Sequence, residues 1–249
     1  MKRHPEETGI FLDLDGTLAE LVDVPEAVRL PAQTRVLLGE LETRYRSVVI
    51  ISGRAASAIR DIVRLPGLTY VGNHGLEVIE SGEHRVWLSS SDATRMRGME
   101  DLLRQSIQLE GVLLELKELS HAIHYRRAPE PRRARRRILA ALERLALEGI
   151  QIREGKFLVQ IRPDASLDKG TAVDRLVRER ATTRVLYAGD DTTDIDAFRV
   201  IGRLADDGLI EGYRVAVEYP EGPEELLSAS DLRVQGVQEV QALLGWLAG

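Results

Sequence analysis

The chain has 249 residues, 43% hydrophobic and 30% charged, which is enough for the core of one large domain or two small ones. It has no cysteine, which excludes disulfides, thiolate metal sites and a cysteine nucleophile, and we expect a cytoplasmic protein. The net charge of −6 argues against general nucleic-acid binding. A polar N-terminus and the lack of any run of ~18 apolar residues predict neither a signal peptide nor a membrane span.

The first part of the chain alternates strand and helix patterns. Apolar runs predict strands at 9–14, 47–51 and 68–72, with a helix over 32–44 and another that ends near Arg64. This β-α-β-α-β order predicts a doubly wound parallel sheet, as in Rossmann-like α/β folds.

The middle of the chain follows a different order, αββαββ, which predicts a small α+β domain inserted into the first one. Its predicted helices and strands are 93–108, 112–118, 121–126, 131–148, 150–154 and 157–161. The α/β pattern then resumes with predicted elements at 168–180, 184–189, 215–217 and 237–247. We therefore expect a core formed by 1–91 and 164–249, and an inserted domain over 92–163.

Two aspartates follow the first predicted strand. An apolar run leads to Asp13 and Asp15, spaced i, i+2, and Gly16 then permits a sharp turn. Carboxylates on one face of a strand crowd together, which needs a cation, a raised pKa or a departure from regular strand geometry. The pattern suits a Mg²⁺ site with a nucleophile and an acid/base group beside it. A chance turn is the alternative; an EF-hand is excluded because Leu18 and Val24 stand where that loop needs Gly and Glu.

A second acidic run follows the strand predicted over 184–189 and contains Asp190, Asp191 and Asp194. If this strand lies beside the first, four or five carboxylates converge, and they repel one another unless a cation is present. A helix start would explain one of these acids, because the helix dipole favours aspartate in the first turn. Three acids within five residues favour a functional interpretation.

Two further polar residues stand at predicted element ends. Lys169 begins the helix predicted over 168–180, where the dipole disfavours a cation by ~0.3–1 kcal/mol unless an anion is bound. Ser52 and the amide of Gly53 could hold a phosphate at a strand-to-helix turn. A solvated lysine and a simple N-cap serine are the alternatives.

Two polar segments remain ambiguous. The turn 73–77 could bind substrate hydroxyls or could be an ordinary turn with a surface histidine. Seven arginines between 126 and 137 are interpreted mainly as a solvated helix face, since aromatic residues, the stacking platforms for nucleic acid, make up only 4% of the chain.

In order and context, four elements resemble the haloacid-dehalogenase-like phosphatases: D-L-D-G-T-L at 13–18, the serine at 52, the lysine at 169 and G-D-D at 189–191. Further strings resemble the trehalose-6-phosphate phosphatases: S-G-R at 52–54, N-H-G-L-E at 73–77, K-E-L-S-x-x-x-H-Y-R at 117–126, R-P at 162–163, D-K-G at 168–170 and G-D-D-T-T-D-x-D-A-F at 189–198. The resemblance covers about 10–200, most of the chain.

The resemblance implies a Rossmann-like core with an inserted α+β cap that closes over a sugar phosphate. Asp13 would attack phosphorus to form an aspartyl-phosphate, and Asp15 would protonate the leaving sugar and then activate water. Mg²⁺ would be held by Asp13, the backbone carbonyl of Asp15 and Asp190, with Asp194 supporting the site.

The resemblance also implies the residues that hold the substrate. Ser52 and Lys169 would bind the transferring phosphoryl group. The residues implied to contact the sugar phosphate are Arg54, Asn73, His74, Glu77, Lys117, Ser120, His124, Arg126, Gln160 and Arg162.

The chain departs from the family pattern at two positions. Ile195 stands where the family usually has glutamate after the last acidic motif, and Gln160 stands where it usually has glutamate two residues before Arg162. A carboxylate only accepts hydrogen bonds from sugar hydroxyls, whereas a Gln amide both donates and accepts. We expect the chemistry to survive both changes and the choice of sugar to be affected.

The leading hypothesis is a Mg²⁺-dependent phosphatase that hydrolyses trehalose 6-phosphate, acting as a monomer on a small molecule, with no nucleic-acid or membrane partner. The alternatives are a phosphatase for another glucosyl compound, such as glucosylglycerol phosphate or sucrose phosphate, a phosphomutase, and a non-catalytic regulator that binds a sugar phosphate. The presence of Asp13, Asp15, Lys169 and Asp190 together argues against the regulator, because a silent copy has no chemical need for all four.

Overall fold

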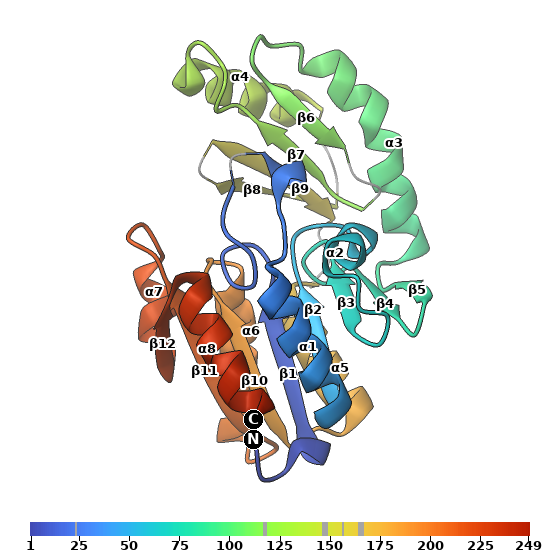
Figure 1. Ribbon diagram of the computed structural model, residues 1–249. Helices are drawn as coiled ribbons and strands as arrows, with labels where there is room; N and C mark the ends of the chain where they lie inside the picture. Colours follow the sequence, from blue (N-terminus) through green and yellow to red (C-terminus); the bar gives the residue numbers. More distant parts are fainter. Residues whose placement is uncertain (23, 117–118, 146–148, 156, 164–166) are drawn as a thin grey trace. The chain divides into compact units, whose positions relative to one another are not determined.

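The chain divides into two compact units, and each is described by itself. The computed structural model describes residues 1–22, 24–116, 119–145, 149–155, 157–163 and 167–249. The first unit comprises Met1–Trp87 and Leu167–Gly249, and the second comprises Leu88–Ser166 (Figure 1).

The first unit is built on an eight-stranded sheet in the order β12-β11-β10-β1-β2-β3-β4-β5. The strands from β12 to β3 run parallel, and β4 and β5 pair antiparallel at one edge. Their bounds are β1 (Thr8–Asp13), β2 (Ser47–Ile51), β3 (Thr69–Gly72), β4 (Glu77–Glu80), β5 (Glu83–Val86), β10 (Arg184–Gly189), β11 (Glu211–Glu218) and β12 (Leu232–Gln235).

Helices cover both faces of this sheet, as expected for parallel strands that are apolar throughout. One apolar core contains residues of α1, α2 and α8, with α1 and α8 lying side by side in Figure 1; the other contains residues of α5, α6 and α7. The helices are α1 (Ala32–Arg44), α2 (Ala56–Val63), α5 (Lys169–Arg180), α6 (Asp194–Asp206), α7 (Glu224–Ser228) and α8 (Gly236–Ala248). Two short 3₁₀ turns are η1 (Pro5–Glu7) and η2 (Pro25–Ala27).

Strand alternation decides which face the first predicted aspartate takes. Ile10 and Leu12 of β1 belong to the α1/α2/α8 core, and Phe11 belongs to the α5/α6/α7 core. Because side chains alternate along a strand, Asp13 shares the face of Phe11, where α5 and α6 begin. The fold therefore directs this carboxylate toward the first residues of those two helices.

The second unit is an antiparallel sheet in the order β6-β7-β9-β8, with two helices on one face. Its elements are α3 (Ser90–Ser106), β6 (Leu113–Leu116), β7 (His121–His124), α4 (Pro131–Arg144), β8 (Ile150–Gly155) and β9 (Leu158–Pro163). Met96 and Leu103 of α3 and Ile138 of α4 pack on Ile123 and Val159 of the sheet. The opposite face of the sheet carries the residues that alternate with this core.

The predicted fold class, a doubly wound parallel sheet with an inserted α+β segment, is confirmed, but several elements differ in detail. The strand predicted over 121–126 ends at His124, because the next residues form a turn closed by Ala128 N–H donating to Tyr125 O (3.2 Å). The strand predicted over 215–217 extends over Glu211–Glu218. The elements β4, β5, α6, α7 and β12 were not predicted.

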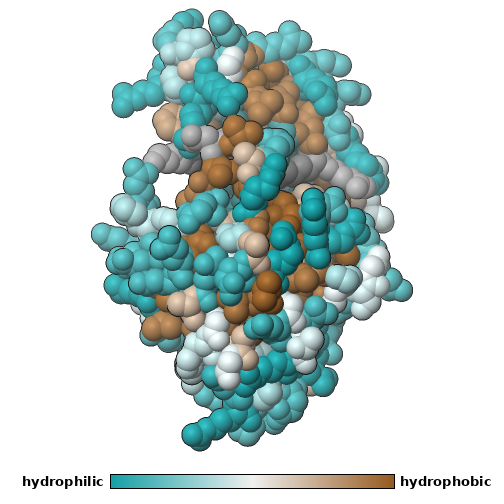
Figure 2. Space-filling model, in the orientation of Figure 1, coloured by the Kyte–Doolittle hydropathy of each residue, from teal (hydrophilic) through white to brown (hydrophobic). Residues whose placement is uncertain are grey.

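The face drawn in Figure 2 is mostly hydrophilic, in keeping with the charged fraction of 30%. Among the described residues, no helix is both long enough and apolar enough to span a membrane.

Gly170 sets the spacing of the helices that begin at the acidic edge of the sheet. A Cβ at this position of α5 would lie 2.4 Å from the backbone oxygen of Asp196 in α6. In α3, by contrast, a Cβ at the exposed Gly98 would meet no heavy atom within 4 Å. Only glycine therefore allows the first turns of α5 and α6 to approach this closely.

We expect Gly170→Ala and Gly98→Ala to change stability in opposite directions. Alanine in a helix gains up to ~1 kcal/mol over glycine, so Gly98→Ala should raise the free energy of unfolding. Gly170→Ala should lower it by ~1–3 kcal/mol, because the added methyl forces the two helices apart. Urea unfolding of both variants measures this; stabilisation by both would contradict the close approach.

Candidate active site

The acids predicted at two strand ends come together at the carboxyl edge of the parallel sheet. Asp13 is the last residue of β1, Asp190 follows β10, and Asp194 opens α6. Strands β1 and β10 are neighbours, with Leu12 opposite Ala188. Carboxylate oxygens of the three buried aspartates all lie within 4.8 Å of one another. The structure thus brings together the two acidic runs singled out in the sequence.

Lys169 places a buried positive charge between these acids. Its Nζ donates to Asp13 Oδ1 (2.6 Å) and to Asp194 Oδ1 (2.7 Å), and the side chain is only 3% exposed. Burial alone would lower the pKa of this ammonium, but the attraction of Asp13 and Asp194 outweighs it and raises the pKa above its ordinary value. The anion expected beside this lysine at the helix start is therefore supplied by the chain itself.

Asp194 is fully engaged in hydrogen bonds. Its Oδ1 accepts from Lys169 Nζ and from the hydroxyl of Tyr187 (2.6 Å). Its Oδ2 accepts from the backbone N–H groups of Asp190 (3.2 Å) and Asp191 (3.0 Å). A carboxylate has about four acceptor sites, so this one is satisfied by the protein alone and fixes the loop after β10.

The other two acids are destabilised as anions. Burial raises the pKa of Asp13 well above its ordinary value; Lys169 opposes this rise, and the neighbouring carboxylates add to it. Burial and then the charge of Asp194 raise the pKa of Asp190 to about 8, with Lys169 again opposing. One ammonium does not balance the carboxylates gathered here, which is the electrostatic setting in which a divalent cation is favoured.

The turn after β1 approaches Asp190 closely. Gly16 has φ +84°, and a Cβ there would lie 2.1 Å from Asp190 Oδ2. The hydroxyl of Thr17 donates to Asp190 Oδ1 (3.4 Å), and that of Tyr219 donates to the backbone oxygen of Gly16 (2.8 Å). Neither Tyr187 nor Tyr219 could be identified from the sequence, since a tyrosine within a strand, as Tyr187 is, or just after one, as Tyr219 is, is more often simple core.

Asp15 does not crowd against Asp13 as a regular strand would require. Strand β1 ends at Asp13, and the carboxylate of Asp15 is held by Arg54, with Nε to Oδ2 at 2.8 Å and Nη2 to Oδ1 at 2.7 Å. Ser52 Oγ lies 3.4 Å from the same carboxylate as a weak donor. A cation, a raised pKa or a departure from strand geometry was expected to relieve the repulsion between Asp13 and Asp15. For this pair, the chain departs from strand geometry.

The loop that carries Ser52 and Arg54 is held by the turn after β3. Asn73 and His74 both have positive φ, 50° and 56°. Their backbone N–H groups donate to the backbone oxygens of Arg54 (2.7 Å) and Ser52 (3.0 Å). The polar turn predicted near 73–77 is thus tied to the residues that face Asp15.

The buried side chain of Glu77 also holds the loop that carries Ser52 and Arg54. Its Oε1 accepts from the backbone N–H of Ala56, at the start of α2, and from Asn73 Nδ2, both at 2.8 Å. Its Oε2 lies 2.6 Å from His84 Nε2 on β5, and the residue is 6% exposed. These contacts make Glu77 a residue that shapes the Ser52 loop, a role that the sequence pattern alone does not indicate.

In the second unit, three of the predicted substrate residues share one face of the sheet. Ile123 and Ile161 point into the helix-covered core, so the alternating residues His124, Gln160 and Arg162 lie on the opposite face. His124 Nε2 lies 3.0 Å from Glu115 Oε2 on the neighbouring strand.

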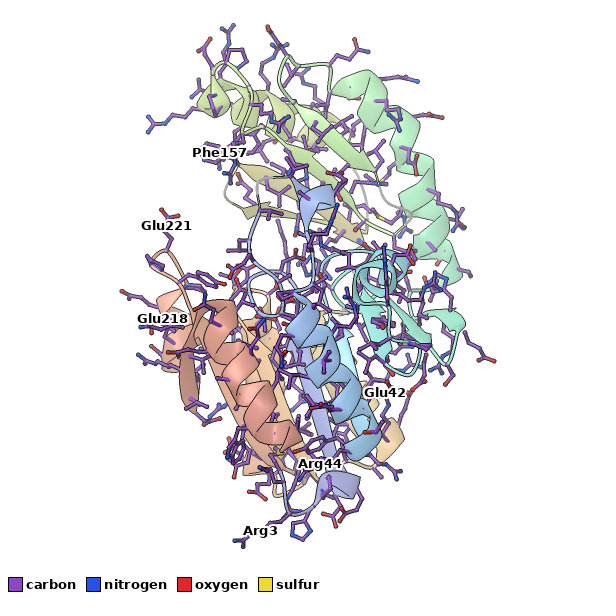
Figure 3. All side chains as sticks on the ribbon, in the orientation of Figure 1. Arg3, Glu42, Arg44, Phe157, Glu218 and Glu221 are labelled. Carbon is purple, nitrogen blue, oxygen red and sulfur yellow. The ribbon has the colours of Figure 1, made fainter. Side chains whose placement is uncertain are left out.

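The other residues predicted in this unit are placed differently. Arg126 lies beyond β7, in a turn, although it was predicted to be the last residue of that strand and so to share a face with His124. Its guanidinium lies 5.6 Å from the ring centre of Phe157, which is labelled in Figure 3. Ser120 directly precedes β7, and Lys117 lies outside the described residues.

The structure also shows where Ile195 and Gln160, the two departures from the family pattern, lie. Ile195 is buried in the α5/α6/α7 core beside Asp194, where a glutamate would need a partner. Gln160 pairs with Ala122 on β7 and with Arg153 on β8.

The sheet order, its acidic carboxyl edge and the α+β segment within the chain define a haloacid-dehalogenase-like fold. A haloacid dehalogenase-like hydrolase from Bacteroides thetaiotaomicron matches 96% of this chain and 99% of its own, with a TM-score of 0.69 at 16% identity. The C-terminal domain of the Candida albicans trehalose-6-phosphate phosphatase matches 100% of this chain and 94% of its own, with a TM-score of 0.81 at 23% identity. Both likenesses concern the fold.

The sequence comparison is more specific. The profile of the trehalose-phosphatase family matches residues 11–228. The trehalose-phosphate phosphatase of Mycobacterium marinum is 34% identical over 203 residues, 78% of this chain. The chain therefore belongs to the trehalose-phosphatase family, and the predicted resemblance is confirmed. It spans about half the length of the curated relatives it matches, 51% for the M. marinum protein.

The raised pKa of Asp190 predicts a pH-dependent stability in metal-free buffer. In the unfolded chain its pKa is ~3.9, so between about pH 4 and pH 8 the folded state holds a proton that the unfolded state has lost. The free energy of unfolding should fall as pH rises through this range and level off above about 8. Asp190→Asn removes this contribution, and its decline should be shallower. Urea unfolding with a chelator present, from about pH 5 to about pH 9, measures both; parallel profiles would contradict the assignment.

Proposed function

We propose that this chain hydrolyses trehalose 6-phosphate to trehalose and phosphate with the help of Mg²⁺. The observation that carries the proposal is the meeting of Asp13, Lys169 and Asp190 at the carboxyl edge of the sheet, in a member of the trehalose-phosphatase family. Ligands of open α/β sheets bind at this edge. The intact set of chemical groups favours an enzyme over a non-catalytic sugar-phosphate-binding regulator.

The acidic cluster fits Mg²⁺, a hard cation that takes carboxylate, carbonyl and water oxygens. We assign as ligands the carboxylates of Asp13 and Asp190 and the backbone carbonyl of Asp15. Asp194 would support this site, and its four hydrogen bonds favour a role in holding Lys169 and the Asp190 loop. When bound, the ion would neutralise charge on the phosphoryl oxygens.

Asp13 acts as the nucleophile in this proposal. A carboxylate oxygen of Asp13 forms a bond to phosphorus while the bond from phosphorus to the sugar oxygen breaks, giving an aspartyl-phosphate and a free sugar alkoxide that must be protonated. Lys169 already contacts Asp13 Oδ1 and can neutralise the negative charge of the transferred group. Ser52, at the end of β2, offers a hydroxyl donor to the same group.

Asp15 acts as the acid and then the base. Arg54 holds its carboxylate in the structure, and a phosphoryl group offers this guanidinium a competing bidentate partner. Asp15 released in this way could carry a proton to the leaving sugar oxygen. In the second step it takes a proton from the water that attacks phosphorus, and the bond from phosphorus to the Asp13 oxygen breaks, which releases phosphate and restores the Asp13 carboxylate.

We propose that the second unit selects the sugar. His124, Gln160 and Arg162, on the face of its sheet opposite α3 and α4, would bind sugar hydroxyls and charge, with Lys117, Ser120 and Arg126 contributing nearby. In the first unit, Asn73 and His74 are the remaining candidates for substrate contact, and Glu77 acts through the loop it supports. The Gln160 amide suits a hydroxyl as either donor or acceptor, so the alternative of another glucosyl phosphate is tested alongside trehalose 6-phosphate.

Asp13→Asn should abolish phosphate release and leave the fold intact, because the amide cannot form the acyl phosphate. Phosphate release should be measured with trehalose 6-phosphate, sucrose phosphate and glucosylglycerol phosphate, each with and without Mg²⁺. Asp61→Asn, at an exposed acid of α2, is the matched control and should keep full activity. Near-normal turnover by pure Asp13→Asn would remove the nucleophile assignment, and a preferred substrate other than trehalose 6-phosphate would correct the sugar.

His124→Ala and Gln160→Ala should lower kcat/KM for the disaccharide phosphate by roughly 10- to 100-fold, the value of one or two hydrogen bonds to a polar or charged group. A small substrate such as p-nitrophenyl phosphate lacks the sugar, so its turnover should change by less than about threefold. Equal losses on both substrates would show that these residues support the fold, and the selectivity assignment would fail.

A further inference from the structure

A polar groove lies entirely within the second unit, between α4 and the end of α3 with the residues that follow it. Its volume is about 540 Å³. Four arginines line it, Arg133, Arg136, Arg137 and Arg144, and none of its lining residues is acidic. Ile107, at the end of α3, contributes an apolar wall.

The arginines follow from the pattern of α4. Ala134, Ile138 and Leu142 repeat every four residues and pack into the core of the unit. Arg133, Arg137 and Arg144 are spaced by four and seven residues, so they share a neighbouring stripe of the helix. The groove is where this stripe meets the end of α3.

Among the described residues, only one of these four arginines has an acidic partner. Arg133 pairs with Glu130 at 3.2 Å. Within the described part of the chain, no ion pair or hydrogen bond is recorded for the side chains of Arg136, Arg137 or Arg144. The first turn of α4 contains no acidic residue, although the positive end of the helix dipole favours one there.

The local charge opposes that of the whole chain. Residues 88–166 hold 15 lysines and arginines against 11 aspartates and glutamates, a formal charge of +4, whereas the whole chain carries −6. A concentration of unpaired cations in an otherwise acidic protein is the electrostatic signature of an anion site.

We propose that this groove binds a small anion that carries two or more phosphate groups. Its volume lies in the range of small-molecule sites, and the planar forks of arginine match phosphate oxygens in pairs. No aromatic residue lines it, which disfavours stacked nucleic-acid bases. Gln105 and Gln108 add amide groups that can bind the uncharged part of such a ligand.

This site is separate from the proposed catalytic groups and does not depend on them. None of its lining residues belongs to the acidic cluster of the first unit or to the sheet face of the second unit that carries His124, Gln160 and Arg162. A ligand here would therefore occupy a site of its own within the second unit. The inference stands even if the proposed substrate is wrong.

The test is calorimetric titration of the full chain with inorganic tripolyphosphate, pyrophosphate and orthophosphate, in Mg²⁺-free buffer. Affinity should fall in that order, because fewer phosphates engage fewer guanidiniums. The double variant Arg137→Gln/Arg144→Gln should bind tripolyphosphate at least about tenfold more weakly. Arg132→Gln, on the same helix but outside the groove, is the matched control and should bind within about twofold of the unchanged chain. Helix content by circular dichroism should be equal in all three, since glutamine and arginine have similar helix propensities.

Several outcomes would overturn the proposal. Equal weakening by the control and the double variant would mean that only general charge is sensed. Unchanged tripolyphosphate binding in the double variant would place the anion elsewhere, for example at Lys169. Tighter binding of an oligoglutamate peptide than of tripolyphosphate, lost in the double variant, would make the groove a surface for acidic protein segments instead.

Discussion

One buried ammonium group holds the carboxyl edge of the sheet together. Lys169 is in contact with Asp13 from β1 and Asp194 from α6, two carboxylates that would otherwise face each other in a medium that screens charge poorly. Removing one partner from a buried ion pair typically costs ~3–5 kcal/mol, because the remaining charge has no solvent. Two features of the surrounding backbone place Lys169 where it can make these contacts. Gly170 lets α5 and α6 approach, and the capping box of Asp168 and Thr171 starts α5 at Lys169.

The same cluster contains more carboxylates than cationic groups, and this excess of negative charge is the feature that favours a bound cation. Asp13 and Asp190 keep raised pKa values despite Lys169, mainly because burial disfavours their anions and also because neighbouring carboxylates repel them. In the proposed function, a divalent cation would offset this repulsion, and a phosphoryl group would then meet a site that is no longer net negative. The second unit has the opposite balance, with a formal charge of +4. The two units thus differ in the ligands they favour, a cation in one and anions in the other.

The elements with strong apolar runs could be predicted from the sequence almost to the residue. Strand β2 and helix α1 have the predicted bounds, because their apolar patterns are bounded by polar or proline residues. Strand β5 could not be predicted, since Glu83-His84-Arg85-Val86 is an exposed edge without an apolar face. Helix α6 begins within the acidic run. Aspartates are expected both at a functional site and at a helix start, so their presence did not by itself reveal the helix.

The acidic and basic groups of the candidate site could be foreseen, but their partners could not. Motif spacing located Asp13 and Asp190, because residues at the ends of neighbouring parallel strands must meet. Lys169 was located by its place at the start of a predicted helix, where the dipole disfavours a cation. The pairing of Asp15 with Arg54 depends on the loop leaving strand geometry, which spacing alone does not reveal. Glu77 and Tyr187 act through hydrogen bonds to groups distant from their own motifs, and no local pattern encodes such contacts.

The central role of Lys169 is tested most directly by a double-mutant cycle on unfolding free energy, with Lys169→Met, Asp13→Asn and the two combined, measured in metal-free buffer. Methionine keeps most of the buried side-chain volume and removes the charge. Lys169→Met alone should lower the free energy of unfolding by ~3–5 kcal/mol, and adding Asp13→Asn should recover part of that loss because one unpaired carboxylate disappears. Losses that simply add, with a coupling below about 0.5 kcal/mol, would show that the ammonium does not hold these acids together.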